Sequence, residues 1–311
     1  MNIISKIKSY INNKINNKSC INESYLNNLR FDLRADYLSH LALTCNETGV
    51  SNQSYFDYEI IVSLTTYNKR IYDVHLAIES IMQGSLKPNR IILWLDDSYR
   101  NQELPITIRK QINRGLEIDY CNDIRSYKKL IPTLKKYPSA AIITIDDDCI
   151  YNYDLIEKLV LNHKINTNAI QANRVTKMGM LDKSTLTPYL SWKDLTSSEL
   201  SSSYLNFPTG CGGILYPPYS LHSEVLNEKV FMELCPTADD VWFKAMSLYN
   251  KRKVEHVYTH NELGNDFLTN DRVQDIALYH KNTSHANCEN DKQLEAVFKR
   301  YNLYNILSSD E

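Results

Sequence analysis

The stretch AAIITIDDDCIYNYDLIEKLV, residues 140–160, places Asp146, Asp147 and Asp148 directly after a strongly apolar run. The run AAIITI (140–145) is apolar almost throughout, which is typical of a strand in a sheet that is covered on both faces. Three adjacent carboxylates repel one another, and burying them unpaired is costly. A hard divalent cation relieves this repulsion, because Mg²⁺ and Mn²⁺ prefer oxygen ligands. The alternative interpretation is a solvated acidic turn.

Three further apolar runs precede this one: EIIVSL (59–64), RIILWL (90–95) and LEIDYC (116–121). Apolar residues recur at helical spacing between the first and second runs, over 71–81, and again over 124–136 before the fourth run. This alternation predicts an α/β fold with a mostly parallel, Rossmann-type sheet flanked by helices. Pro132 predicts a kink or a late start in the second of these helices.

Each predicted strand is followed by charged or hydroxyl residues, and the carboxyl ends of parallel strands meet at the edge where such sheets bind ligands. The candidate ligand-binding residues are Thr65, Thr66, Tyr67, Arg70, Asp96, Asp97, Arg125, Lys128, Lys129, Asp146, Asp147 and Asp148. The basic residues among them suit the oxygens of a diphosphate, although each one alone is more typical of a surface charge. In an extended segment Asp146 and Asp148 would face the same way.

The sequence argues against several classes of protein. The chain has neither a GxxxxGK[ST] loop nor a GxGxxG fingerprint, which argues against P-loop NTPases and dinucleotide enzymes. A formal net charge of −2 over 311 residues argues against a nucleic-acid partner. Seven cysteines without CxxC spacing are typical of free thiols in a reducing cytoplasm. The sequence shows no secretory signal, and we expect a cytoplasmic protein.

Two later motifs are candidates for the rest of the site. The glycines of PTGCGG (208–213) favour a tight loop with close backbone approach to a ligand, or else a structural turn. In TADDVWFKAM (237–246), Thr237 and Asp240 match a capping box at the start of a helix that buries Trp242. An acid in a first helical turn is held rigidly, so it is also suited to accept a proton from an attacking hydroxyl.

The two ends of the chain are predicted to be helical. Residues 1–58 form an appendage with a second helical pattern over 26–43, and the main fold divides into 59–190 and 191–311. Within residues 1–22, four lysines and an amphipathic pattern are compatible with peripheral contact with an anionic membrane, at the inner face of the plasma membrane, or with a solvated helix. Residues 290–307 are expected to form a C-terminal helix.

Six motifs in order, VSLTTYNKR, PNRIILWLDD, RSYKKLIPTLKKYP, IITIDDDCIY, PTGCGGILYPP and TADDVWFKAM, resemble bacterial GT-A-fold glycosyltransferases of surface polysaccharide synthesis, in the family-2-like group. The resemblance covers residues 59–300. It implies that Asp148 is a direct ligand of Mn²⁺ or Mg²⁺ and that Asp146 contacts the nucleotide as well as the metal.

The resemblance also assigns roles to the other motif residues. It places Thr65, Tyr67 and Arg70 in the first nucleotide loop, Asp96 or Asp97 at the base or ribose, and Lys128 and Lys129 at the diphosphate. It assigns the general base to Asp240 or Asp239, although the group usually has Glu-Asp there. The acceptor pocket would be bordered by Gly210, Gly212, Gly213 and Trp242. Some GT-A enzymes add a late histidine to the metal, which makes His280, or else His285, a candidate, although a lone histidine is more often structural.

These inferences predict a metal-dependent glycosyltransferase. The donor is a nucleoside-diphosphate sugar, expected to be UDP-linked, and the acceptor is a hydroxyl of a growing surface glycan or lipid-linked oligosaccharide. With Asp240 or Asp239 as a base the reaction inverts, and without one the same fold supports retention. The alternatives are a metal-dependent nucleotidyltransferase and a non-catalytic glycan- or nucleotide-binding module.

Overall fold

The computed structural model describes residues 25–199, 201–259, 267–276, 282–283 and 288–307. Two predictions fall outside these ranges and stay predictions. One is the membrane-surface role of residues 1–22, and the other is metal binding by His280 or His285. No helix of the described part combines the length and the apolar character that crossing a membrane requires.

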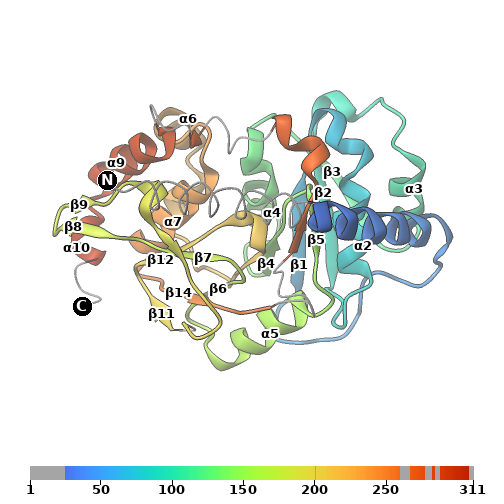
Figure 1. Ribbon diagram of the computed structural model, residues 1–311, viewed down its shortest axis with the longest axis horizontal. Helices are drawn as coiled ribbons and strands as arrows, with labels where there is room; N and C mark the ends of the chain where they lie inside the picture. The colour runs from blue at the N-terminus through green and yellow to red at the C-terminus, as the bar shows by residue number, and fades with distance from the viewer. Residues whose placement is uncertain (1–24, 200, 260–266, 277–281, 284–287, 308–311) are drawn as a thin grey trace, which may run out of the picture.

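The predicted α/β architecture is confirmed by a large sheet of eight described strands (Figure 1). Its strands are β1 Ile60–Thr65, β2 Arg90–Asp96, β3 Leu116–Cys121, β4 Ala141–Thr144, β6 Ile170–Ala172, β11 Ser202–Ser203, β13 Ile214–Tyr216 and β14 Val254–His256. They lie in the order β11-β14-β6-β13-β4-β1-β2-β3. The four strands predicted from apolar runs are β1 to β4, and each lies within one residue of its expected position.

Most neighbouring strands of the sheet run parallel to each other. β1 pairs in parallel with β2 and with β4, β2 pairs in parallel with β3, and β6 with β14. β13 lies between β4 and β6 and is antiparallel to both, and β11 is antiparallel to β14 at the edge. The sheet takes strands from both sides of residue 190, and the predicted division into 59–190 and 191–311 stays a prediction.

Helices cover both faces of this sheet (Figure 1). Within the described residues, the α-helices after the N-terminal one are α2 Val74–Met82, α3 Ile106–Ile112, α4 Ile131–Lys136, α5 Leu155–Ile165, α6 Glu228–Leu234, α7 Asp239–Tyr249, α9 Glu289–Tyr301 and α10 Tyr304–Leu307. The short 3₁₀ helices that concern the site are η1 Asn68–Tyr72, η2 Asp97–Tyr99, η3 Arg125–Lys129, η5 Gly210–Gly212 and η7 Asp271–Ile276. The remaining strands form small sheets: β7 Val175–Lys177 with β10 Lys193–Asp194 and β12 Asn206–Pro208, β5 Cys149–Tyr151 with β15 Phe267–Thr269, and β8 Met180–Asp182 with β9 Thr185–Leu186.

Two local predictions about helices have clear outcomes. Pro132 lies in the first turn of α4, and η3 precedes it, so the predicted late start is confirmed. The single helix expected over 290–307 is interrupted, because Asn302 adopts a left-handed conformation (φ 52°) between α9 and α10.

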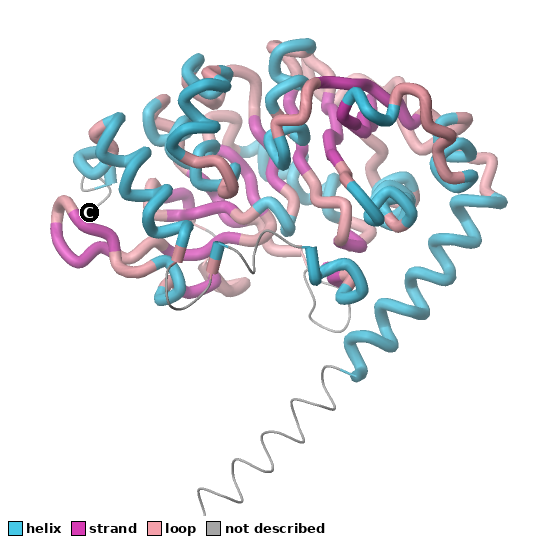
Figure 2. The backbone as a smooth tube through the Cα atoms, turned by 90° about the horizontal axis from the view of Figure 1, so that it is seen from above, coloured by secondary structure: helices cyan, strands magenta, loops and turns pink. Residues whose placement is uncertain are grey.

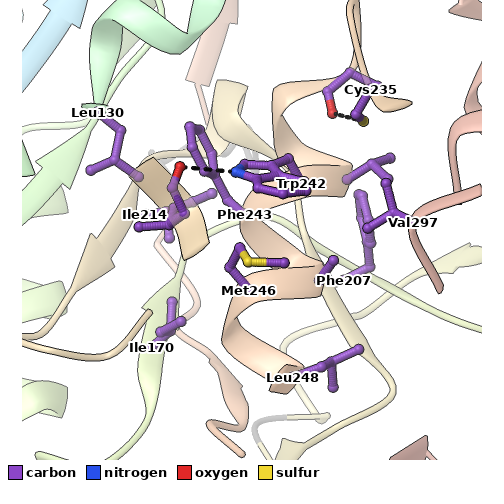
Figure 3. Packing of buried hydrophobic residues seen from close by; sticks show 14 of the residues in the cluster. Leu130, Ile170, Phe207, Ile214, Cys235, Trp242, Phe243, Met246, Leu248 and Val297 are labelled. Carbon is purple, nitrogen blue, oxygen red and sulfur yellow. Dashed lines mark hydrogen bonds between the residues drawn. The ribbon is translucent and has the colours of Figure 1, made fainter. Parts of the chain in front are cut away.

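The core lies on both faces of the sheet, as continuous apolar strands require. Ile142 and Ile143 of β4 belong to different buried clusters, because successive side chains of a strand point to opposite faces. On one face α7 contributes Trp242, Phe243 and Met246, which pack with residues such as Val297 of α9 (Figure 3).

The N-terminal helix, described over residues 25–44, confirms the helical pattern predicted for 26–43. Phe31, Ala35 and Leu38 of this helix are buried against Leu76 of α2 and Ile150 of β5. Figure 2 shows that the amino-terminal end of this helix extends away from the rest of the molecule.

Candidate active site at the carboxyl edge of the sheet

The candidate site lies where the chain changes direction across the sheet. β1 is flanked by β2 on one side and by β4 on the other. The connection from β1 leads through α2 to β2, and the connection from β4 leads through α5 to β6 on the other side. Such a switch point leaves a crevice outside the carboxyl ends of the two central strands. The loop after β1 and the triple aspartate after β4 therefore lie beside each other.

A first group of contacts, the arginine cluster, consists of Arg70, Asp147, Asp148, Thr66 and Gln274. Asp147 accepts hydrogen bonds from Thr66 Oγ1 at 2.6 Å and from Arg70 Nη1 at 2.8 Å. Asp148 Oδ2 lies 3.1 Å from Arg70 Nη2 and accepts a hydrogen bond from Gln274 Nε2 at 2.7 Å. Burial raises the pKa of Asp147 to about 6, even though Arg70 acts to lower it.

A second group, the lysine cluster, consists of Lys129 and three carboxylates. Lys129 Nζ lies 2.8 Å from Asp146 Oδ1, 3.0 Å from Asp239 Oδ2 and 3.9 Å from Asp240 Oδ1. Burial acts to lower the pKa of Lys129, but the three carboxylates raise it well above its usual value. Lys129 is therefore a buried, charged centre that holds together acids from two distant parts of the chain.

The predicted capping box at the start of α7 is wrong. The N-cap residue is Ala238, without a side-chain cap. Thr237 is instead bound by Gln293 of α9, which accepts from Thr237 N at 3.0 Å and donates to Thr237 Oγ1 at 2.9 Å. Asp240 Oδ2 accepts a hydrogen bond from Gly210 N at 2.9 Å. The first-turn acids are thus turned toward the sheet edge.

Asp239 and Asp240 differ in their surroundings. Asp239 accepts a hydrogen bond from Ser126 Oγ at 2.8 Å, and its side chain is 10% exposed, against 28% for Asp240. Among the described residues, Asp240 Oδ1 is buried without a hydrogen-bond partner. Burial raises the pKa of Asp240 to about 7, and Asp239 and Asp146 add to the effect while Lys129 opposes it. A carboxylate of this kind accepts protons near neutral pH.

Of the three predicted acceptor-site glycines, Gly210 meets the lysine cluster. A Cβ at Gly210 would lie 2.6 Å from Lys129 Nζ and 3.0 Å from Asp240 Oδ1, so only glycine leaves the two groups in place. A Cβ at Gly212 would instead lie 2.5 Å from the Cβ of Arg174. Gly213 has φ +89° at the turn into β13. These two glycines serve the loop rather than the clusters.

Trp242 does not border an acceptor pocket, and that prediction is wrong. Its side chain is fully buried, and its Nε1 donates to Val225 O at 3.1 Å (Figure 3). The ring packs against Phe231 of α6 and Tyr301 of α9. The residue therefore anchors α7 to α6 and α9.

The remaining predicted residues of the first two loops lie near the edge but outside the two clusters. Thr65 Oγ1 donates to Trp94 O at 2.8 Å and so links β1 to β2. Tyr67 is 39% exposed, and Arg70 lies over its ring at 5.8 Å. Asp96 accepts a hydrogen bond from Ser98 N at 3.0 Å at the start of η2, and Asp97 forms an exposed ion pair with Arg100 at 2.7 Å.

The basic residues of η3 have separate partners. Arg125 Nη1 donates to Pro236 O at 2.7 Å, which connects η3 to the segment before α7. Lys128 is buried and forms an ion pair with Asp123 at 2.5 Å, so it points away from Lys129's acids. Of the three predicted basic residues here, Lys129 is the one that enters the clusters.

The sequence did not indicate Ser126, Gln274 or Tyr151. Ser126 holds Asp239, Gln274 holds Asp148, and Tyr151 Oη accepts a hydrogen bond from Asp146 N at 2.8 Å. Ser126 lies inside the RSYKK motif, which is the one available signal. Gln274 follows Asp148 by 126 residues, and no periodic pattern connects the two.

The triple aspartate is a turn rather than the extended segment expected. Residues 147 and 148 form the turn, and Asp147 shares Arg70 with Asp148 while Asp146 contacts Lys129. The expectation that Asp146 and Asp148 face the same way is therefore wrong, because Asp146 contacts Lys129 while Asp148 contacts Arg70 and Gln274. The reversal of the chain lets consecutive carboxylates enter two different clusters.

The chemistry of the two clusters suits a hard cation. Five carboxylates, Asp146 to Asp148, Asp239 and Asp240, face the cations Arg70 and Lys129, which leaves a formal excess of three negative charges. Within the described ranges, no three Asp, Glu, His or Cys side chains are grouped so that they would hold a metal ion unaided. Mg²⁺ commonly uses one or two carboxylates and completes its shell with phosphate oxygens and water. Asp148 and Asp146 supply carboxylates of that kind, and in this structure Asp148 binds Arg70 and Gln274 while Asp146 binds Lys129.

Solved structures similar to this chain include two crystal structures of S. aureus TarS 1-349, one of them in complex with UDP. Both are 14% identical to this chain, with TM-scores of 0.42 and 0.43. The alignments cover 67% and 65% of this chain and 59% and 58% of TarS 1-349, so this chain matches less than two thirds of that protein's length. No family model and no curated protein matches the chain.

Proposed function

We propose that this chain is a metal-dependent glycosyltransferase. It transfers a sugar from a nucleoside-diphosphate sugar, UDP-linked in our proposal, to a hydroxyl of a growing bacterial surface glycan or its lipid-linked precursor, with inversion. The observation that carries the proposal is the meeting of two acid clusters, one around Arg70 and one around Lys129, at the switch point of the sheet.

The two clusters suit two different tasks. The arginine cluster lies after β1 and β4, where α/β sheets bind nucleotides, and it contains Asp148 as a proposed metal ligand. The lysine cluster contains the first turn of α7 and the Gly210 loop, which suits an acceptor. Asp146 contacts Lys129 and directly precedes the arginine-cluster acids, so it connects the nucleotide side with the acceptor side.

Asp240 is the residue that we assign as general base. Asp240 Oδ1 lies 3.9 Å from Lys129 Nζ, whereas Asp239 lies 3.0 Å from Lys129 Nζ and accepts a further hydrogen bond from Ser126 Oγ at 2.8 Å. In the proposed step, Asp240 accepts the proton of the acceptor hydroxyl while that oxygen attacks the anomeric carbon and the bond to the diphosphate breaks. Gly210 N holds the other oxygen of Asp240 at 2.9 Å and so orients the carboxylate.

The surroundings of the base serve the same step. Lys129 keeps Asp146, Asp239 and Asp240 close together despite their repulsion, and Asp148 with Asp146 would hold the divalent cation. When bound, that cation supplies positive charge where the departing diphosphate gains negative charge. Arg70 is occupied by Asp147 and Asp148, so its role in the proposal is to position these acids.

The test is nucleotide release by the purified full chain from a panel of nucleotide sugars, with and without Mn²⁺. We expect free UDP from a UDP-sugar, only with the metal, and strongly reduced release by Asp148→Ala and by Asp240→Asn. Asp182→Ala is the matched control, because Asp182 lies on the exposed β8–β9 hairpin.

Two outcomes would overturn the proposal. Release of pyrophosphate from a nucleoside triphosphate supplied together with a sugar phosphate, with no UDP released from any nucleotide sugar, would favour a nucleotidyltransferase on the same clusters. Unchanged product formation by folded Asp148→Ala and Asp240→Asn would remove both assigned roles.

A further inference from the structure

The N-terminal helix (residues 25–44) has a second apolar face. Phe31, Ala35, Leu38 and Ala42 are buried against the body of the protein. On the opposite side, Leu26, Leu29, Leu33 and Tyr37 are 47%, 43%, 65% and 52% exposed. Their spacing of three, four and four residues places them along one line of the helix, which we call the stripe. Figure 2 shows this helix extending into open space.

Charged residues of the helix lie on both sides of the stripe, positive on one side and negative on the other. At 3.6 residues per turn, Arg30 and Arg34 lie on one flank, and Asp32 and Asp36 lie on the other. A helix that lies on an anionic membrane carries basic residues around its apolar face. Asp32 is paired with Arg272 at 2.6 Å, and Arg34 and Asp36 carry opposite charges on the two flanks. The charges beside the stripe are therefore mixed rather than uniformly basic, which does not fit that surface.

The same charges fit a second copy of this helix in one orientation. When two identical helices face each other in parallel, related by a twofold axis along their length, each flank of one helix meets the opposite flank of the other. The arginine flank then meets the aspartate flank on both sides of the contact. In an antiparallel pair each flank meets its own copy, which places arginines against arginines and aspartates against aspartates.

We propose that two copies of this chain associate through the stripe, with their N-terminal helices parallel. Leu26, Leu29, Leu33 and Tyr37 form the apolar seam, and Arg34 of each copy faces Asp36 of the other. The stripe consists of four side chains, whereas a standard stable interface has about 20–30 residues on each side, so we expect a weak, reversible dimer. This inference is independent of the proposed reaction.

The test is sedimentation equilibrium of the full chain over a range of protein concentrations. We expect reversible monomer–dimer behaviour. Leu29→Glu/Leu33→Glu should weaken the association at least about tenfold, because it places like charges in the seam. Ile165→Glu is the matched control, since Ile165 is 83% exposed on α5, outside the N-terminal helix, and this variant should dimerise normally.

A charge exchange tests the orientation. Arg34→Glu and Asp36→Lys should each weaken self-association, because each creates two repulsive contacts in a parallel pair. A mixture of the two variants should restore a dimer, since Glu at 34 then faces Lys at 36 and Asp36 faces Arg34. Asp32 is left unchanged because it already binds Arg272 at 2.6 Å.

Three results would overturn the inference. The first is a full chain that is monomeric at every concentration. The second is a dimer that Leu29→Glu/Leu33→Glu leaves intact. The third is a monomer that binds equimolar phosphatidylcholine–phosphatidylglycerol vesicles through the stripe, shown by loss of that binding in the double variant, which would make a membrane the occupant.

Discussion

Lys128 and Lys129 are neighbours with the same side chain, yet they have different partners. Lys128 binds Asp123 within its own loop, and Lys129 binds acids from β4's loop and from α7. Both belong to η3, in which consecutive side chains leave the backbone in different directions. The motif RSYKK predicted basic residues at the sheet edge, but the choice between the two depends on that backbone geometry.

The raised pKa of Asp240 predicts a limb on the acidic side of the pH–activity profile, where activity falls as the pH falls. Its pKa is raised to about 7, so the base form is lost as the pH falls through that value. We expect activity at saturating donor and metal to rise with pH through about 7 and then to level off. Asp240→Asn should lower turnover at least about 100-fold above pH 8, and the difference from the wild type should shrink as the pH falls below about 7. A profile that is flat between pH 5 and 9, roughly two units on either side of that pKa, would exclude Asp240 as the base.

Lys129 should set the position of that limb. Because Lys129 acts to lower the pKa of Asp240, Lys129→Met is expected to move the limb to higher pH and to reduce stability by exposing three acids to one another. Lys128→Met is the matched control, for it removes a buried lysine outside the cluster and should leave the limb in place. The two pH profiles, measured side by side, check this.

Some residues of the candidate site could be predicted from the sequence, and others could not. Asp146 to Asp148 and Asp240 were found from charge at the end of an apolar strand and from motif order. Trp242 was assigned to an acceptor pocket, but its ring is in the core, since the side of a helix that faces solvent follows from packing. Gln274 carried no signal at all, because its contact with Asp148 joins positions 126 residues apart.

At the scale of elements, the strands were predicted well and the helix starts less so. Burial on both faces gives β1, β2 and β4 continuous apolar runs that few other structures produce. The capping box predicted at the start of α7 is absent, because Thr237 and Asp240 bind residues from other parts of the fold instead of each other's backbone. Gln293 of α9 binds the backbone N–H and the hydroxyl of Thr237, and Asp240 turns to Gly210.

This contact predicts that α9 supports the acids of α7. Gln293→Ala should lower the free energy of unfolding by about 1–3 kcal/mol, because Thr237 N and Oγ1 lose their buried partner. Activity should fall as well, since Thr237 precedes Asp239 by two residues. Lys292→Ala is the neighbouring control on the same helix, with an exposed ion pair, and should change stability by at most about 0.5 kcal/mol. Equal unfolding midpoints in urea for the two variants would contradict this role.

A buried ion pair connects α2 to the segment after α3. Arg114 Nη1 lies 2.8 Å from Glu79 Oε2, and the two side chains are 3% and 0% exposed. Glu79→Ala should destabilise the fold by about 3–5 kcal/mol, because the arginine is left charged and unpaired in the interior. Glu103→Ala breaks the exposed pair with Arg109 and should cost less than about 1 kcal/mol. Urea unfolding of both variants tests the difference.

At the scale of the whole molecule, binding at the sheet edge should stabilise the fold. Manganese together with UDP is expected to raise the melting temperature by several degrees, since ligand at 100 times its dissociation constant adds about 2.7 kcal/mol. Asp148→Ala should lose this increment while Asp182→Ala keeps it. Thermal unfolding with metal alone, UDP alone and both together would show whether the two bind cooperatively, and equal increments in all variants would argue against binding at Asp148.

The antiparallel strand β13 has a consequence for how such a molecule diversifies. It begins beside the end of β4, with Ile214 opposite Thr144, so the loop that enters it is delivered to the same edge as the loops that leave the parallel strands. The loop of residues 209–213 thereby brings Gly210 to the proposed acceptor side. Among the described residues, this loop forms no hydrogen bond with Arg70, Asp147 or Asp148. Under the proposed function, substitutions within residues 209–213 would act on the acceptor side and leave the hydrogen bonds of Arg70, Asp147 and Asp148 in place. A lineage with the proposed reaction would then be free to change its acceptor while it keeps its donor.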